Sequence, residues 1–139
     1  MEEPIKIVYN SDTSNFEITT FDLVVKQGNT KTFVLNFVDE NDAAYDITGA
    51  TIFFTVKSDL ADADADADLT KDIIEHSSPA AGESKIELAP DDSLNRESGL
   101  IDLLGNYFCD IKIKLDTDEI FTVAEGLIAF TKGVTQRDS

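Results

Sequence analysis

The residues with the greatest capacity for chemistry are acidic, and they gather in an alternating alanine and aspartate run over residues 61–68. In a calcium-binding loop of twelve residues, carboxylates at positions one, three, five and twelve hold the ion. Here these positions would be filled by Asp64, Asp66, Asp68 and Glu75. The template also needs a glycine at position six for its sharp turn, and this chain has Leu69 there. We therefore expect a solvated loop and no bound metal.

Two pairs of neighbouring carboxylates have the residue types for acid and base catalysis of glycoside hydrolysis. They are Asp91 with Asp92, and Asp116 with Asp118. That mechanism requires two carboxyls facing each other across a cleft, one of them partly buried. Both pairs lie in patterns typical of turns, where acidic residues are common. We therefore expect no catalytic residue and predict that the protein is not an enzyme.

The chain has one histidine, His76, and one cysteine, Cys109. One histidine does not make a histidine-rich metal site, and one cysteine cannot close a disulfide within the chain. Cys109 also falls on the apolar face of a predicted strand, whereas a reactive cysteine needs an exposed, electropositive setting. We expect no cofactor and neither redox nor zinc chemistry.

The charge of the chain restricts its partners. Twenty-eight acidic residues against eleven lysines and arginines give a formal charge of -17. Such a surface repels the phosphates of nucleic acids and of anionic lipids. The first residues are acidic where a secretory signal would be basic, and no apolar run is long enough to span a bilayer. We expect neither nucleic acid nor membrane as a partner.

The sequence pattern predicts that these residues lie on or between β-strands. With 139 residues, 42% of them apolar and nine of them phenylalanine, the chain should form a single domain with a core. Apolar side chains alternate with polar ones in short segments bounded by turn residues, and almost no helical period is present. The predicted strands are residues 5–9, 21–26, 33–37, 52–57, 69–76, 85–88, 107–115 and 120–131. Gly28 and Gly49 stand at turns that need a positive φ.

This pattern predicts an all-β chain, an immunoglobulin-like β-sandwich of about seven or eight strands. One short helical turn is expected near residues 90–96, where a proline precedes acidic residues. Residues 1–17 would be an N-terminal arm or a first strand, residues 18–131 the sandwich and residues 132–139 a polar tail.

Details of strand pairing and burial are also predicted. Residues 21–26 and 33–37 should form a β-hairpin around Gly28. Residues 116–119 should be the hairpin turn before the last strand, and that strand should be irregular at Gly126. Cys109, Ile111 and Ile113 should share the buried face of the preceding strand.

Six motifs, taken in their order along the chain, resemble the N-terminal domain of phage baseplate upper proteins. They are VVKQGNT at 24–30, FVL at 33–35, DITGATIFFTVK at 46–57, KIELAPDDS at 85–93, GNYFCDIKI at 105–113 and EGLIAF at 125–130. The likeness covers roughly residues 18–131, nearly the whole chain. It implies an immunoglobulin-like domain that anchors a phage protein to the tail baseplate.

From this resemblance we expect a non-enzymatic virion structural protein, made in the host cytoplasm. It would dock on tail, baseplate or neck proteins as an adaptor or decoration, with three-fold or six-fold assembly in the particle. The residues expected at the protein interface are Ile5, Ile7 and Tyr9 in the N-terminal segment, and Leu100, Ile101, Leu103 and Leu104 in an irregular loop over residues 94–104.

The alternative is a carbohydrate-binding module that attaches a particle to a host cell surface. Its sugar-stacking platform would use the aromatic side chains of Tyr9, Tyr45 and Phe53. The absence of tryptophan from the sequence argues against this alternative.

Overall fold

The computed structural model describes residues 2–26, 28–57, 69–89, 94–95, 101–102 and 105–131. The described part is built almost entirely from strands, joined by turns and by one short 3-10 helix, η2 (Pro79–Ala81). The strands are β1 (Glu2–Asn10), β2 (Asn15–Glu17), β3 (Thr19–Lys26), β4 (Lys31–Asp39), β5 (Thr51–Lys57), β6 (Leu69–Ile73), β7 (Glu83–Leu88), β8 (Leu94–Asn95), β9 (Ile101–Asp102), β10 (Gly105–Lys114) and β11 (Ile120–Thr131).

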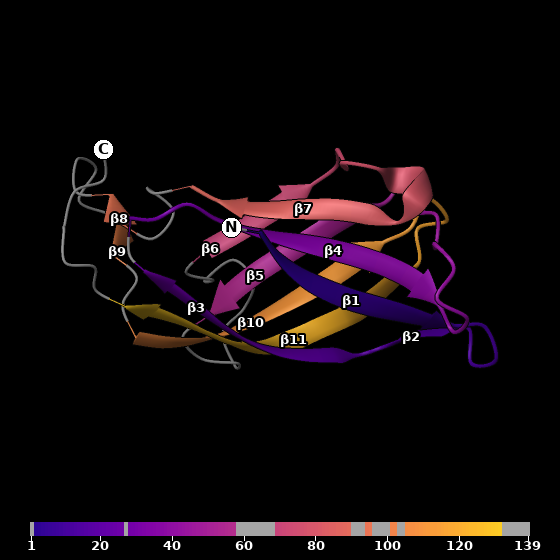
Figure 1. Ribbon diagram of the computed structural model, residues 1–139, viewed down its shortest axis with the longest axis horizontal. Coiled ribbons are helices and arrows are strands. Elements are labelled where there is room, and N and C mark those ends of the chain that lie inside the picture. Colours follow the sequence, from indigo (N-terminus) through magenta and orange to yellow (C-terminus); the bar gives the residue numbers. More distant parts are fainter. Residues whose placement is uncertain are drawn as a thin grey trace.

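Nine of these strands form two sheets that lie one over the other (Figure 1). The first sheet has the order β2-β1-β4-β7, and the second has the order β3-β11-β10-β5-β6. Each sheet contains one parallel pair, β1 with β4 and β3 with β11, while the other pairings are antiparallel. The predicted all-β sandwich is therefore confirmed.

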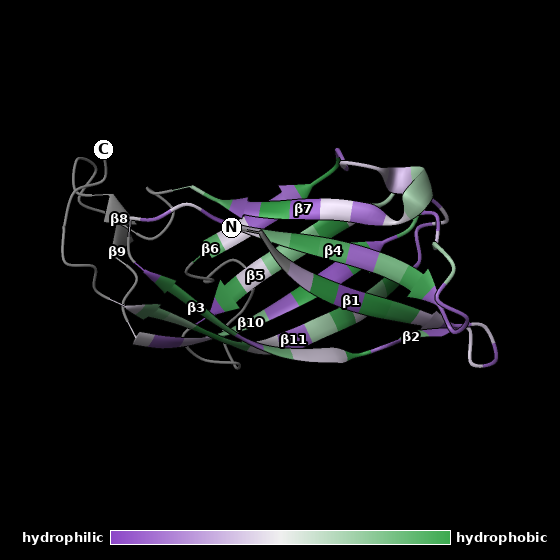
Figure 2. Cartoon of the chain, in the orientation of Figure 1, coloured by the Kyte–Doolittle hydropathy of each residue, from purple (hydrophilic) through white to green (hydrophobic). Residues whose placement is uncertain are grey.

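The core lies between the two sheets and follows from the period of two along each strand. Figure 2 shows apolar and polar residues alternating along the strands, because successive side chains point to opposite faces. Phe33 of β4 and Phe54 of β5 meet across the sandwich with ring centroids 6.4 Å apart. Each fully buried side chain of this size stabilises the fold by about 1.5–3 kcal/mol. The largest fully buried side chains are Phe33, Phe37, Phe54, Phe130, Ile7, Leu35, Ile47, Ile52, Ile86, Leu88 and Ile111.

The chain passes between the sheets at the two ends of β3. Only Ile18 separates β2 in the first sheet from β3 in the second, and the Thr19 hydroxyl donates to the Lys6 carbonyl at 2.8 Å. At the other end, Gly28 has the expected positive φ, 77°, and leads back to β4 in the first sheet. The predicted hairpin of residues 21–26 and 33–37 is therefore wrong, because these strands lie in opposite sheets.

The turn before β5 is organised by Asp46. Its carboxylate accepts hydrogen bonds from the hydroxyl and the backbone N–H of Thr48, at 2.5 and 2.9 Å. These bonds favour the ionised form and lower the pKa of the Asp46 carboxyl. Gly49 follows with a φ of 81°, as the sequence predicts, and the Ala50 N–H donates to the Ile47 carbonyl at 3.0 Å.

The predicted hairpin turn at residues 116–119 is confirmed between β10 and β11. The Leu115 N–H donates to the Glu119 carbonyl at 2.8 Å, and the Asp118 N–H donates to the Leu115 carbonyl at 2.9 Å. The register shift in this hairpin lies between Ile111 and Lys112, opposite Val123. The irregularity expected at Gly126 is therefore three residues away from where the sequence placed it.

The helical turn expected near residues 90–96 is not found at Leu94 and Asn95. These two residues form β8, which pairs with β9 in a small antiparallel sheet. Residues 90–93 and 96 lie outside the described part of the chain, as does residue 1 of the N-terminal segment. None of the helical segments within the described ranges has the length and apolar character to cross a bilayer.

Candidate functional site

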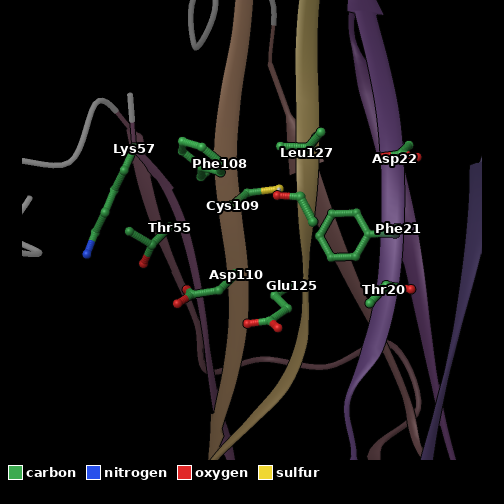
Figure 3. Close-up of a pocket in the computed structure, with 11 residues that line it drawn as sticks. Thr20, Phe21, Asp22, Thr55, Lys57, Phe108, Cys109, Asp110, Glu125 and Leu127 are labelled. Atoms are coloured by element: carbon green, nitrogen blue, oxygen red, sulfur yellow. Dashed lines mark hydrogen bonds between the residues drawn. The ribbon is translucent and has the colours of Figure 1, made fainter. Parts of the chain in front are cut away.

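The outer face of the second sheet is hollowed into a groove with a volume of about 540 Å³. Figure 3 shows its side chains on four neighbouring strands, β5, β10, β11 and β3. Strand register arranges most of them in two rows that cross these strands. The first row is Lys57, Phe108, Leu127 and Asp22, and the second is Thr55, Asp110, Glu125 and Thr20. We call this hollow the outer groove.

The first row has an apolar centre and charged ends. Phe108 on β10 pairs directly with Leu127 on β11, and their exposed fractions are 36% and 46%. Lys57 stands beside Phe108 on the β5 side, and Asp22 beside Leu127 on the β3 side. Large apolar side chains adjacent to each other on a solvent-facing sheet surface are candidates for contact with another molecule.

The second row brings two carboxylates together. Asp110 on β10 pairs directly with Glu125 on β11. Like charges directly opposite each other on neighbouring strands destabilise a sheet. The two carboxylates make this part of the groove acidic.

The floor of the outer groove is formed by Phe21, Cys109 and Gly126. Gly126 pairs with Cys109 on one side and with Phe21 on the other, and its lack of a side chain allows the Phe21 backbone to approach closely. The Cys109 thiol donates to the Gly126 carbonyl at 3.7 Å. Burial, with a smaller contribution from the charge of Asp110, raises the pKa of Cys109 to about 12.

This setting predicts an unreactive thiol. A shift from the ordinary pKa of 9.0 to about 12 lowers the thiolate fraction at pH 8 roughly a thousandfold, and burial also blocks access. Because the thiolate fraction is so much smaller, we expect Cys109 to react with a chromogenic disulfide reagent at least about a hundredfold more slowly in the folded protein than in guanidinium. Rapid labelling of the folded chain would contradict this placement of Cys109.

The other carboxylates that the sequence singled out do not assemble a catalytic site in the described part of the chain. Asp116 and Asp118 are exposed in the turn between β10 and β11, where the Lys114 ammonium lies 3.7 Å from Asp118. Asp91 and Asp92 lie outside the described residues, and so do Asp64, Asp66 and Asp68. Glu75 is exposed, and no group of three or more potential ligands that could hold a metal is found among the described residues.

His76 has a structural position that the sequence did not reveal. One ring nitrogen, Nε2, lies 2.7 Å from the Ala50 carbonyl, and the other, Nδ1, lies 2.8 Å from the Ser84 hydroxyl. Since a carbonyl only accepts, Nε2 donates and a neutral ring accepts from Ser84 at Nδ1. Ser84 is completely buried, so the ring satisfies a polar group inside the sandwich and links the ends of the two sheets.

The residues predicted for a protein interface are placed as follows. Ile5 and Ile7 on β1 are 5% and 0% exposed, so the domain itself covers these two side chains. Tyr9 is half-buried. Leu100, Leu103 and Leu104 lie outside the described residues, and Ile101 is described only through the backbone of β9.

The aromatic side chains considered for sugar stacking are spread over the molecule. Tyr9 and Tyr45 pack on each other with centroids 4.7 Å apart, and both contact the buried ring of Phe16. Desolvation of this half-buried position raises the pKa of the Tyr45 hydroxyl. Phe53 lies on β5 of the second sheet, opposite Lys112. These rings therefore do not form a common platform.

The residues of the outer groove were not predicted as a site from the sequence. One signal was present: Phe108 is an aromatic residue on the face of its strand that otherwise carries Asp110, Lys112 and Lys114. Leu127 gave no comparable signal, because the register shift opposite Val123 reverses which residues of β11 face outward. The pairing of Phe108 with Leu127 could be recognised only in the structure.

No protein-family model matches the chain. No curated protein matches it. Among solved structures, the N-terminal domain of phage TP901-1 ORF48 is similar at 13% identity and a TM-score of 0.49, over 95% of this chain and 100% of that chain.

Two copper proteins are also similar. Auracyanin A from Chloroflexus aurantiacus has 10% identity and a TM-score of 0.41, over 94% of this chain and 100% of that one. A copper-containing nitrite reductase from Thermus scotoductus has 11% identity and a TM-score of 0.38, over 99% of this chain and 29% of that one. At these identities and TM-scores, none of the three likenesses carries a functional argument.

The residues of this chain do not fit a blue-copper site. Such a site is built from two histidines and one cysteine, and the 139 residues contain one histidine. That histidine, His76, is engaged by Ala50 and Ser84, and Cys109 is buried opposite Gly126. The donor set for this kind of copper chemistry is therefore missing from the sequence.

Proposed function

We propose that this chain is a phage virion structural protein without catalytic activity, which docks on tail, baseplate or neck proteins as an adaptor or decoration. Its partners are then other virion proteins, and its place is the assembled particle. Assembly with three-fold or six-fold symmetry is part of the proposal, because rotational symmetry repeats one interface around a closed ring.

One observation carries the proposal: six motifs occur in the order found in the N-terminal domain of phage baseplate upper proteins. They fall on the elements that build the sandwich. The first spans the connection from β3 to β4, the third spans the Asp46 turn and β5, and the last two fall on β10 and β11. The resemblance therefore concerns the scaffold, and the docking function is inferred from it.

The proposed docking surface includes Tyr9 and the loop over residues 94–104, with Leu100, Ile101, Leu103 and Leu104. Deleting residues 96–100 tests this part of the interface. If the loop docks on a partner, the shortened protein keeps its cooperative unfolding and is lost from purified particles. Retention of the shortened protein at the normal level would rule out the loop as a contact.

The function itself is tested with particles that are purified on a density gradient from cells carrying the gene. The protein should sediment with the particles and stay with them through a high-salt wash. Binding of host polysaccharide by the isolated chain would favour the carbohydrate-binding alternative instead.

A further inference from the structure

We propose that the outer groove binds an extended segment of a partner protein that presents an apolar side chain next to an arginine or lysine. This inference rests on the proposed docking function and adds the surface that is used and the chemistry of the partner segment. The groove lies on the opposite sheet from Tyr9, so it is a contact separate from that part of the interface considered above.

The apolar half of the groove provides the anchor site. Phe108 on β10 and Leu127 on β11 are direct neighbours, and both side chains are partly exposed to solvent. Val24 on β3, which is 62% exposed, continues this apolar surface beside Ala129. An apolar side chain of the partner that covers Phe108 and Leu127 would remove the apolar surface of all three side chains from water, which favours association.

The acidic half determines the charge of the partner. Asp110 and Glu125 face each other across β10 and β11, and Asp22 lies on the far side of Leu127. A guanidinium group can donate to two carboxylates at once, and a cation near Asp110 and Glu125 is attracted by both of their charges. Lys57 stands at the opposite end of the groove from Asp22, so the cation of the partner is expected near Glu125.

The spacing of the two rows fixes the geometry of the segment. Phe108 and Asp110 are two positions apart on one strand, as are Leu127 and Glu125, which corresponds to about 7 Å along a strand. Side chains two positions apart in an extended segment lie on one face at the same distance. The partner therefore carries its apolar residue and its cation at positions i and i+2.

The charge of the molecule argues against other occupants. Two copies that met face to face would each carry a formal charge of -17, and the repulsion between them opposes their association. Nucleic acid and anionic lipid carry the sign of charge that this surface repels. A cationic segment of another protein is complementary to it.

The experiment is an NMR titration of the full ¹⁵N-labelled chain with synthetic twelve-residue peptides. The probe repeats leucine, serine, arginine and serine, so that leucine and arginine are two positions apart on one face. In one comparison peptide glutamate replaces each arginine, and in the other serine replaces each leucine. We expect saturable shifts confined to amides of β3, β5, β10 and β11 with the first peptide, and at least tenfold weaker binding of both comparison peptides.

Matched variants identify the site. Combining Asp110→Asn with Glu125→Gln should weaken binding of the first peptide at least tenfold. Combining Asp12→Asn with Glu87→Gln makes the same change in charge at exposed positions outside the second sheet, and should alter binding less than twofold. Absence of binding, shifts scattered over the whole surface, or equal losses for the two variants would each overturn the proposal.

The variants also separate this inference from the proposed function. If the unmodified chain is absent from purified particles, the proposed function fails whatever the peptides do. If the unmodified chain is present and the Asp110→Asn, Glu125→Gln variant is present at the same copy number, the groove is not a docking site and the proposed function stands.

Discussion

Replacing Gly126 by alanine is expected to destabilise the protein more than any other single methyl group added to a described glycine. A Cβ atom at Gly126 would lie 1.8 Å from the Phe21 carbonyl oxygen and 2.8 Å from its carbon. Both are backbone atoms of the paired strand β3, so they cannot move aside like the end of a flexible side chain. Relief requires β11 and β3 to separate, which costs about 3–5 kcal/mol of the free energy of unfolding.

Urea denaturation followed by circular dichroism measures this loss, and the melting temperature should fall by roughly 10–20 °C. Gly105→Ala is the matched control. Gly105 begins β10 in the same hairpin with a φ of 102°, and no heavy atom lies within 4 Å of the added Cβ. The control carries only the cost of an unfavourable backbone conformation, about 1–2 kcal/mol. Equal losses in the two variants would contradict the close approach of β11 to β3.

Gly82→Ala is expected to have the next largest effect, for two reasons that act together. Gly82 has a φ of 74°, which L-residues rarely adopt, and its added Cβ would lie 2.3 Å from the Phe37 carbonyl oxygen. The Tyr45 carbonyl oxygen is 2.7 Å from the same point. Because three backbone segments meet here, we expect a loss of about 3 kcal/mol or more in the free energy of unfolding.

The contacts around Gly82 indicate which neighbouring segments the Gly82→Ala substitution should destabilise. Its carbonyl accepts the Phe37 N–H at 2.7 Å, and its N–H donates to the Pro79 carbonyl at 3.0 Å, closing the short helix η2. Amide hydrogen exchange should therefore accelerate first at the end of β4 and at Tyr45. Gly49→Ala is a useful comparison, since it has a similar φ of 81° and its nearest neighbour is a side-chain atom of Asp116 at 3.1 Å. A loss for Gly82→Ala no greater than that for Gly49→Ala would show that the backbone contacts do not matter.

Alternation of residue types was sufficient to predict the strands and most of the core. Cys109, Ile111 and Ile113 are all buried on the expected face of β10, and Phe33, Leu35 and Phe37 on that of β4. The positive φ of Gly28 and Gly49 also follows from residue type, because glycine tolerates it without steric cost. These features depend on local rules, and local rules are visible in one sequence.

Strand pairing was not visible in the same way. An alternating pattern shows which face of a strand is buried. The same pattern does not show whether two strands pair in one sheet or face each other from opposite sheets. Residues 21–26 and 33–37 are compatible with either arrangement, and the structure places them in opposite sheets. The register shift opposite Val123 is likewise set by the fit of β11 between β3 and β10, which no short segment specifies.

The candidate groove depends on such pairings. Phe108, Asp110, Leu127 and Glu125 become two rows only when β10 and β11 are aligned in their observed register. The sequence indicated an acidic surface and argued against anionic partners. The sites considered from the sequence were, however, a protein interface in residues 94–104 and a metal site that included aspartates from residues 61–68. A partner for the outer groove would be cationic, so the overall charge of -17 and the local site point to the same class of partner.

We propose that this chain is a component of a phage particle, and quantitative mass spectrometry of purified particles can test that proposal. Particles should be freed of host protein on a gradient and digested, with isotope-labelled peptides of this chain and of the major tail protein as standards. The proposal predicts a fixed copy number per particle, divisible by three or six, that does not change between preparations. Absence of the chain from particles whose other tail proteins are all detected would contradict it.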